Sequence, residues 1–549
     1  MGIPHPLFLF IAAATSNLIP RLTSVKLSLW SYFWVAAGFY SIQVVVFGFY
    51  HVILWPKFLS PLRHIPGPKD GNFFMGQFTT IIREPSGEPL RRWTREIPHE
   101  GLIKYTHVFN SERVAPVSPK ALSEVLVTKN YEFVKPERLR KGLGRILGVG
   151  VLVAEGDEHK RQRKLLAPAF AFRHIKNLYP LFWRKTQECV RQMQFALPSD
   201  RVIDIGDWAS RITLDIIGLA GVGQDFNSIS DPSNALNQTY RKIFGQPRMT
   251  LAFQLAGFFL PQWFLRALPV QRNRDFKEAI ATIKKTAREL IAARRDRFAQ
   301  QKNEKGNDPE AEKELDVLSV AMKSGGFSDE DLVNQLMTFL AAGHETTSSA
   351  MQWAVHLLCR HPKIQTKLRE ELRAALPDIR DPNASITSTD IDRLAYLQAV
   401  CSETLRLIPP VAVTIRIAAK DTSIVEQFIP KGTTIVLSPW TVNTSPQLWD
   451  DPMTFKPERW LSSMNPTKAA NGGADSNFAF MTFLHGPRSC IGGTLARSEF
   501  AVILAGWVLA FEMALEKPCE PDEMVEIQRG AITAKPRGGS KVVLTPVKR

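Results

Sequence analysis

Cysteine is scarce in this 549-residue sequence, which contains five cysteines, an odd total with no Cys-x-x-Cys pair. This pattern excludes a disulfide framework and a zinc cluster, and it favours a reducing compartment. The five residues are Cys189, Cys359, Cys401, Cys490 and Cys519. With 44% hydrophobic and 22% charged residues, the chain can bury a large core and is neither disordered nor fibrous.

A low-complexity linker that could separate two domains is also missing after about residue 70. The polar run from Gln300 to Glu314 is interpreted as a solvated loop, because helical patterns continue on both sides of it. We therefore expect one large body, spanning residues 70–549.

Charge is absent from residues 28–55, which contain no Asp, Glu, Lys or Arg. A helix of this length measures about 42 Å, enough to cross a hydrocarbon core of about 30 Å. Trp30, Trp34 and Trp55 lie towards its ends, as interfacial anchors do. The segment predicts a transmembrane helix.

The segments on either side of this helix predict how it is attached and oriented in the membrane. Residues 1–27 form an N-terminal apolar segment whose stretch from Ile3 to Ile19 is either a second span or an interfacial segment. Residues 56–69 form a proline-rich hinge that includes HIPGP. Lys57, Arg63 and Lys69 outweigh the cations before the helix, which predicts a body facing the cytosol.

The periodicity of the body predicts a mainly α fold with minor β structure. The longest predicted helix, 328–360, begins at the capping residue Ser328, has three acids in its first turn and ends before Pro362. Further helices are predicted at 158–170, 201–221, 362–376 and 395–407, and strands at 414–418, 433–438 and 541–547.

The segment FLHGPRSCIGG, from Phe483 to Gly493, frames a single cysteine with glycines, a proline and an arginine. It contains the pattern F-x-x-G-x-R-x-C-x-G, which resembles the haem-binding loop of the cytochrome P450 family, the haem-thiolate monooxygenases. The resemblance extends from about Pro66 to the C-terminus. It implies the cytochrome P450 fold behind the N-terminal helix, and haem b as cofactor.

Each residue of the loop has a role that this resemblance implies. Cys490 would be the axial thiolate ligand of the haem iron, at the start of a helical pattern whose amides can tune the sulfur. Phe483 would shield the sulfur, and Arg488 would pair with a haem propionate. Gly486 would permit the tight turn, and Gly492 the close approach of the backbone to the porphyrin.

The segment AAGHETT, 341–347, lies in the middle of the longest predicted helix. Its glycine and threonines can loosen the helical ladder, and the Thr346 hydroxyl can bond to the carbonyl of Ala342. Ala342, Gly343, Glu345, Thr346 and Thr347 resemble the family pattern A-G-x-[DE]-T-[TS]. The resemblance implies contact with the cofactor at the first two residues and proton delivery to bound dioxygen by Glu345 and Thr346.

Two further sets of residues resemble family motifs. Glu403 and Arg406 match E-x-x-R and, with Arg459 of FKPERW, imply a structural cluster that braces the cysteine loop. His159 and Arg163 match W-x-x-x-R, with histidine in place of the common tryptophan, and are expected to contact a haem propionate together with the strand residue Arg416.

The net charge of +16 accompanies no nucleic-acid-binding motif, so acidic partners and lipid headgroups are expected instead of RNA or DNA. Lys160, Arg161 and Lys164 form one such basic cluster. The chain also lacks a flavin or nicotinamide fingerprint. NADPH and flavins are therefore expected to act only through a partner, an NADPH-dependent flavoprotein reductase, with cytochrome b5 as a second candidate donor.

The resemblance implies a membrane-bound monooxygenase of the endoplasmic reticulum that oxidises a lipophilic small molecule. The predicted apolar wall consists of Ile146, Leu147, Val411, Val413 and Ile532. The sequence as a whole resembles enzymes of filamentous fungi that modify terpenoids, polyketides or alkaloids. Alternatives are a haem-thiolate isomerase or dehydratase, a housekeeping sterol or fatty-acid hydroxylase, and a haem sensor without enzymatic activity. The Glu345 and Thr346 pair argues against the isomerase, which needs no proton relay.

Overall fold

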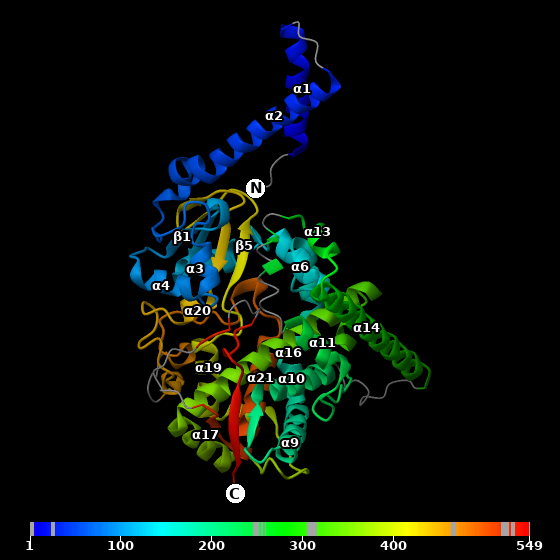
Figure 1. The fold of residues 1–549 in the computed structure, drawn as a ribbon. Helices are drawn as coiled ribbons and strands as arrows, with labels where there is room; N and C mark the ends of the chain where they lie inside the picture. The colour runs from blue at the N-terminus through cyan, green and yellow to red at the C-terminus, as the bar shows by residue number, and fades with distance from the viewer. Residues whose placement is uncertain are drawn as a thin grey trace.

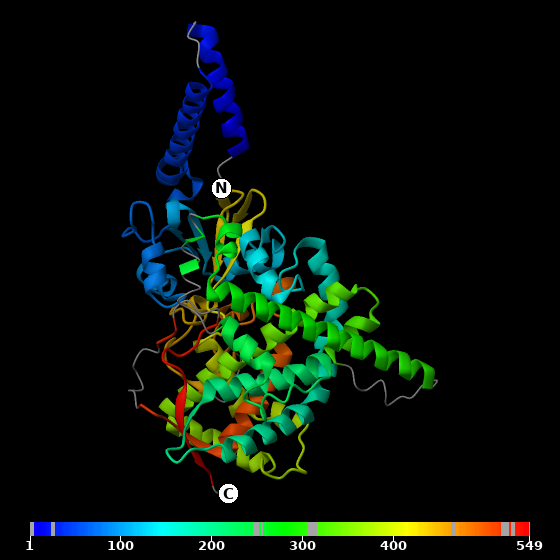
Figure 2. The same ribbon diagram turned by 45° about the vertical axis from the view of Figure 1, so that its right-hand side comes forward.

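Helices dominate the molecule, and two of them stand apart from the body (Figures 1 and 2). The computed structural model describes residues 5–23, 28–244, 252–253, 256–257, 260–304, 316–462, 468–517, 526–528 and 533–547. The α-helices are α1 His5–Thr23, α2 Leu29–Phe49, α3 Phe78–Arg83, α4 Glu88–Glu96, α5 Pro119–Ser123, α6 Glu137–Leu147, α7 Gly156–Leu166, α8 Phe172–Ile175, α9 Tyr179–Phe195, α10 Ile205–Val222, α11 Ala235–Phe244, α13 Gln262–Ala267, α14 Gln271–Glu304, α15 Val317–Lys323, α16 Asp329–Arg360, α17 Pro362–Ala375, α18 Ser388–Asp392, α19 Ala395–Leu407, α20 Pro439–Asn443 and α21 Gly493–Ala510.

The N-terminal helices form an antiparallel pair that projects from one end of the body (Figure 1). The apolar helix α2 continues through a π-helical segment, so the helical run extends to Leu59, beyond the predicted end at Trp55. The Phe8 ring meets Phe47 edge to face at 5.6 Å, and the Tyr32 hydroxyl donates a hydrogen bond to the Ala13 carbonyl. The first four residues of the predicted hinge, 56–59, are therefore helical.

Helix α16 crosses the body and has the predicted start. The Ser328 hydroxyl accepts a hydrogen bond from the Asp331 amide, and the Asp331 carboxylate accepts one from the Ser328 amide. This capping box satisfies amides that a helix start otherwise leaves unbonded. The helix is continuous to Arg360, so the predicted loosening around Gly343 is not seen in the secondary structure.

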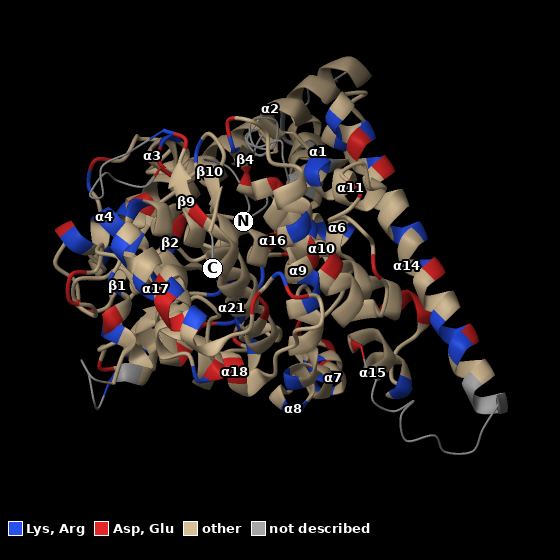
Figure 3. Ribbon diagram, turned by 90° about the horizontal axis from the view of Figure 1, so that it is seen from below, with Lys and Arg blue, Asp and Glu red and all other residues tan. Residues whose placement is uncertain are grey.

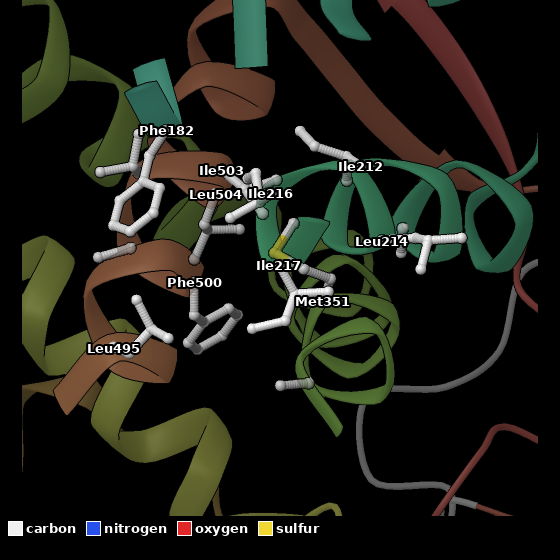
Figure 4. Packing of buried hydrophobic residues seen from close by; sticks show 14 of the residues in the cluster. Phe182, Ile212, Leu214, Ile216, Ile217, Met351, Leu495, Phe500, Ile503 and Leu504 are labelled. Atoms are coloured by element: carbon white, nitrogen blue, oxygen red, sulfur yellow. The ribbon is translucent and has the colours of Figure 1, made fainter. Parts of the chain in front are cut away.

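The main core lies where α9, α10, α16 and α21 meet. Figure 4 shows α10 residues such as Ile216 facing Leu504 of α21 and Met351 of α16. At Gly343 the packing between α10 and α16 is so close that a Cβ atom would lie 2.9 Å from the Ile217 side chain. Glycine at this position therefore allows α10 to approach α16, a reason different from the predicted contact with a cofactor.

The other predicted helices are present, with two differences. Helices α17 and α19 match their predicted ranges, and α7 is followed by a 3-10 turn at Ala167–Phe170. The predicted helix 201–221 begins later, at Ile205, because Val202–Asp204 forms strand β4 and pairs with β10. The polar run at 300–314 begins as helix, since α14 ends at Glu304. Residues 305–315 lie outside the described part of the chain.

Sheets make up the minor part of the described structure. The five-stranded sheet has the order β1-β2-β8-β5-β3, the three-stranded sheet β4-β10-β9, and β6 pairs with β7. The strands are β1 Leu102–Thr106, β2 Glu112–Pro116, β3 Phe133–Val134, β4 Val202–Asp204, β5 Thr414–Ala418, β6 Thr422–Ile424, β7 Gln427–Ile429, β8 Thr434–Leu437, β9 Phe511–Leu515 and β10 Lys541–Pro546. Strands β5, β8 and β10 match the three predicted strands. The antiparallel pair β3 and β5 brings residue 133 beside residue 418.

Charge on the surface is mixed rather than uniformly basic. Lys, Arg, Asp and Glu alternate along α14, as Figure 3 shows. In the predicted basic cluster of α7, Lys160 pairs with Asp157 at 2.7 Å and Arg161 pairs with Glu158 at 2.7 Å. Acids on the same helix therefore neutralise part of this cluster.

Candidate active site

The loop around Cys490 is fixed by its backbone. The Cys490 amide donates a hydrogen bond to the Phe483 carbonyl at 2.9 Å. Gly486 has φ +75°, and a Cβ atom there would lie 2.1 Å from the Leu126 carbonyl oxygen. Any other residue would strain the turn and collide with that backbone, so the glycine is required. At Gly492 a Cβ atom would meet only the Phe170 ring, at an ordinary 3.7 Å.

Cys490 lies just before α21, whose first residue is Gly493. Cys490 is exposed on a recess of about 450 Å³, although the surrounding protein still disfavours a charge on its sulfur. Burial raises the pKa of the Cys490 thiol, whereas a backbone bond from Gly492 and the charge of Arg163 act in the opposite direction. The recess is lined by Phe172, Tyr179, Asp392, Gln398, Phe483, Cys490, Ile491, Gly493, Thr494, Arg497 and Ser498.

Helix α7 brings two predicted residues to the loop. Arg163 donates to the Ser489 carbonyl at 2.7 Å, next to Cys490 in the sequence. His159 is buried, and its Nδ1 lies 3.1 Å from the Tyr131 hydroxyl. Burial, and then the charge of Lys135, lowers the pKa of His159 to about 4. At neutral pH its ring is therefore an uncharged hydrogen-bonding group.

Arg488 is buried and is held from three sides. Its guanidinium donates to the Asn130 carbonyl at 3.0 Å and to the Phe133 carbonyl at 2.6 Å, and it forms an ion pair with Glu155. Its Nε atom is buried without an acceptor among the described residues. Leaving a buried charged donor unbonded is costly, so this atom indicates a missing acceptor.

Two more cations share this region. Arg416 of β5 is buried, and burial, followed by the charge of Arg488, lowers its pKa to about 10. Lys135, directly after β3, has its Nζ 3.6 Å from Glu155. Burial, then the charges of Arg416 and Arg488, lowers the pKa of Lys135 to about 7. Sequence reasoning missed Lys135 and Glu155. The pairing of β3 with β5 brings Lys135 towards Arg416, and Glu155, directly before α7, reaches this region only through tertiary packing.

These cations outnumber their counter-charges. Within the described structure, Glu155 is the carboxylate that pairs with Arg488 and Lys135, and Arg416 donates only to Ile415 and Thr414 of its own strand. Buried positive charge without compensation is unfavourable. Haem b fits this arrangement, because it carries two carboxylates and an iron that a cysteine thiolate can ligate. When bound, it supplies dioxygen activation.

On α16, the acid and the alcohol of the predicted pair point to different partners. The Thr346 hydroxyl donates to the Ala342 carbonyl at 2.8 Å, the bond that sequence reasoning expected. The Glu345 carboxylate contacts the Thr533 hydroxyl at 2.7 Å and the Lys535 ammonium at 2.7 Å. Both partners belong to the C-terminal segment, and neither had been predicted.

The structure brings Glu403, Arg406 and Arg459 together in a buried cluster. Arg406 donates two hydrogen bonds of 2.8 Å to the two Glu403 oxygens, and Arg459 donates one of 3.0 Å. The Lys456 amide and the Trp460 indole also donate to Glu403. The carboxylate is thus satisfied from both chain segments, and the pKa of Glu403 lies below its usual value although burial opposes this.

The predicted apolar wall is described only in part. Leu147 is buried, and its carbonyl accepts a bond from Thr338 of α16 at 2.7 Å. Ile146 and Val413 are half-buried and pack against the main core. Val411 is half-buried, and Ile532 lies outside the described residues.

Comparison with known proteins gives a consistent result. A family model described as "Cytochrome P450" matches residues 66–540. The chain is 44% identical to "Cytochrome P450 monooxygenase sphH" of Aspergillus fumigatus, over 91% of each chain. It is 38% identical to "Cytochrome P450 monooxygenase FUM15" of Gibberella moniliformis, over 92% of each, and 39% identical to "Cytochrome P450 monooxygenase ALT8" of Alternaria alternata, over 89% of this chain and 90% of the relative.

Proposed function

The chain belongs to the cytochrome P450 monooxygenases, with haem b as cofactor, and on that premise we propose a membrane-attached enzyme of secondary metabolism. It takes electrons from an NADPH-dependent flavoprotein reductase, or from cytochrome b5 as a second donor. With dioxygen it hydroxylates, epoxidises or further oxidises a lipophilic small molecule.

The observation that carries this proposal is the position of Arg488. It stands two residues before Cys490 and carries a buried Nε without an acceptor among the described residues. The same short loop thus offers a sulfur for a metal and an unsatisfied cation for a carboxylate. Arg416, Lys135 and Arg163 add positive charge around it. An iron porphyrin with propionate side chains supplies both the metal for the sulfur and the carboxylate for the cation.

In this proposal the loop residues divide the binding. Cys490 would hold the haem iron; burial disfavours its thiolate form, and the Gly492 backbone and Arg163 favour it. Arg488, Arg416 and the neutral imidazole of His159 would bond the propionates. Phe483 lines the same recess as Cys490 and would shield the sulfur when haem is bound.

Helix α16 would provide proton transfer. Glu345 is a buried carboxylate, and Thr346 is a hydroxyl on the next residue. An acid and an alcohol together can hold and move the protons that dioxygen reduction consumes. An isomerase or dehydratase does not consume protons in this way, so this pair favours the monooxygenase.

The substrate is proposed to be an apolar terpenoid, polyketide or alkaloid skeleton. Support comes from the apolar residues Leu147 and Val413 and from similarity to fungal monooxygenases. A housekeeping sterol or fatty-acid hydroxylase would use the same machinery, and comparing these substrates in one assay distinguishes the two.

Membrane attachment is proposed to use both N-terminal helices. The run Leu29–Leu59 has the length and hydropathy of a membrane span, and its apolar 18-residue window has no buried residue in the structure. Gly493–Ala510 also meets these criteria, but it is mostly buried and belongs to the core. Since α1 packs antiparallel to α2, we propose that α1 is a second, shorter span. The location is the endoplasmic reticulum, with the body in the cytosol.

The test uses the full chain in microsomes with an NADPH-dependent reductase. We expect lipophilic compounds from fungal extracts to change the haem absorption spectrum and to stimulate NADPH oxidation with formation of oxygenated product. Product formation without NADPH would instead support the isomerase. A chain that folds but binds no haem would exclude both.

A further inference from the structure

The carboxylate of Glu345 is held by the far end of the chain. Its Oε1 atom accepts a hydrogen bond from Thr533, which is buried, and lies 2.7 Å from Nζ of Lys535. The Lys535 side chain is 25% exposed, whereas that of Glu345 is 9% exposed. Lys535 therefore connects a buried acid with a more open part of the molecule.

The segment that carries these two side chains is anchored to α16. The Ala534 carbonyl accepts bonds from the Trp353 indole at 2.7 Å and from the Ser349 hydroxyl. The Ala534 amide donates to the Pro410 carbonyl at 2.8 Å. Thr533 and Lys535 thus approach Glu345 from a fixed backbone, and their contacts are not those of a loose surface loop.

This arrangement bears on the proton pair. Both described contacts of the carboxylate go to the C-terminal segment, and the Thr346 hydroxyl is engaged with Ala342. The Lys535 ammonium and the Thr533 hydroxyl both contact the same carboxylate oxygen, Oε1. To receive a proton and pass it on, Glu345 must weaken its bond to Lys535.

We propose that Lys535 and Thr533 are positioning residues that set the ionisation and orientation of Glu345, and so control proton delivery to dioxygen. The proposal rests on the proposed function, because it assigns to Glu345 a proton that the monooxygenase reaction consumes. Lys535 and Thr533 themselves touch neither dioxygen nor haem in this scheme.

Other titratable groups near this site come from known elements. On α16 itself, His344 is buried, and its Nε2 lies 2.9 Å from the Ser210 hydroxyl of α10. From α21, Glu499 lies close to Thr347, and burial raises the pKa of its carboxyl well above the usual value. Among the described residues, Lys535 is the cation that forms an ion pair with Glu345.

The first experiment needs no organic substrate, because it uses NADPH, dioxygen and a flavoprotein reductase with the full-length holoenzyme. The quantity measured is hydrogen peroxide formed per NADPH oxidised, as a function of pH. Reduction of dioxygen to hydrogen peroxide takes two electrons and two protons, and reduction to two waters takes four electrons and four protons. A larger share of peroxide therefore reports slower delivery of the protons that cleavage of the O–O bond requires. We expect this ratio to change around one pH midpoint in the wild type, and to lose that dependence in Glu345→Gln.

The decisive variants are Lys535→Met, Lys535→Arg and Lys541→Met. Lys535→Met removes the cation that contacts the Glu345 carboxylate, so the midpoint of the peroxide ratio should move upward in this variant. Lys535→Arg keeps the charge and should restore the wild-type midpoint. Lys541, an exposed residue of β10 nearby in the sequence, serves as the control.

A Lys535→Met midpoint equal to that of the wild type would overturn the proposal, as would a wild-type ratio that does not depend on pH. A purely structural role for Lys535 would lower stability in both Lys535 variants and leave the midpoint where it is. Restoration by arginine separates these two possibilities.

A second experiment does not depend on electron transfer, so it remains informative if the reductase is not the partner. Thermal unfolding midpoints are compared at pH 7.5 for Lys535→Met, Glu345→Gln and the double variant. Residues in direct contact give non-additive effects. We expect Lys535→Met to cost at most half as much in the Glu345→Gln background as in the wild type, because it no longer leaves a buried charge unpaired. Additive losses would contradict the ion pair and the proposal.

Discussion

Glu403 and Arg406, one turn apart on α19, are joined by two parallel hydrogen bonds of 2.8 Å, and both side chains are fully buried. Their fork-shaped contact links α19 to the segment that carries Arg459, and through it to the region preceding the cysteine loop. Because a buried ion pair is costly to break from one side, this contact gives a direct test of what holds the loop.

Replacing Glu403 with Gln should destabilise the protein by about 3–5 kcal/mol, since it leaves Arg406 and Arg459 without their shared counter-charge. Denaturant unfolding, together with the fraction of purified protein that retains haem, measures the effect. The matched control is Glu370→Gln, an exposed acid with the same spacing to Arg373. If both variants lose the same free energy of unfolding and the same fraction of haem, the cluster does not stabilise the protein more than an exposed acid does.

Replacing Cys490 with Ser should abolish the red-shifted absorption band of the reduced carbon monoxide complex, because a hydroxyl does not supply a thiolate ligand. Cys359→Ser, at a half-buried cysteine on α16, should retain the band. A Cys490→Ser protein that keeps the band would remove the ligand assignment.

Replacing Lys135 with Met should speed haem release about ten-fold to a hundred-fold, because a hydrogen bond to a charged group is worth about 1.5–3 kcal/mol. Transfer of haem to excess apomyoglobin gives the rate. Lys141→Met is the control, since Lys141 is exposed on α6 and pairs with Glu137. If the rate of haem release is unchanged in Lys135→Met, Lys135 serves only as the ion-pair partner of Glu155 and does not bind haem.

The pH dependence of stability should include a contribution from His344. Burial mainly, and Lys535 in addition, lower its pKa to about 4, although Glu345 acts in the opposite direction. Between pH 6.5 and pH 4, the imidazole of His344 is protonated in the unfolded chain but not in the folded chain. The free energy of unfolding that is present above pH 6.5 is therefore lost progressively as the pH falls towards 4. The loss amounts to about 3 kcal/mol.

Thermal unfolding of His344→Gln between pH 7 and pH 4 measures this contribution. The variant should show a flatter profile than the wild type, whereas His64→Gln, at an exposed histidine, should follow the wild type. If the His344→Gln and wild-type profiles are parallel, other groups cause the acid sensitivity.

Deleting residues 2–59 should release the body from microsomal membranes, because it removes both N-terminal helices. Deleting residues 2–27 removes α1 alone and should leave the protein in the membrane pellet, held by α2. Sedimentation after a carbonate wash distinguishes the two. Complete pelleting of the first variant would indicate that another surface dominates attachment.

Much of the fold follows from local sequence signals. The capping serine and acids of 328–360 and the periodicity of 395–407 specify α16 and α19, because helix ends and faces depend on near neighbours. Strand β4 was missed at Val202, since its pairing with β10 is set by residues at the other end of the chain.

The candidate site also contains some residues that the sequence predicts and others that only the structure reveals. Motifs identified Arg163, Arg416 and Arg488, which follow recognisable residues nearby. Lys135 and Glu155 stand in no such pattern, and they meet Arg416 and Arg488 only through tertiary packing. The partners of Glu345 lie about 190 residues further along the chain, where no local signal links them to α16.

The bonds from Thr533, Ala534 and Lys535 to α16 have a consequence for protein synthesis. Synthesis proceeds from the N-terminus, and Thr533 is made 188 residues after Glu345, so α16 has to begin folding without these partners. The middle of α16 therefore receives them only late in synthesis. A premature stop codon between α21 and Thr533 would remove these partners and leave α16 and α21 encoded.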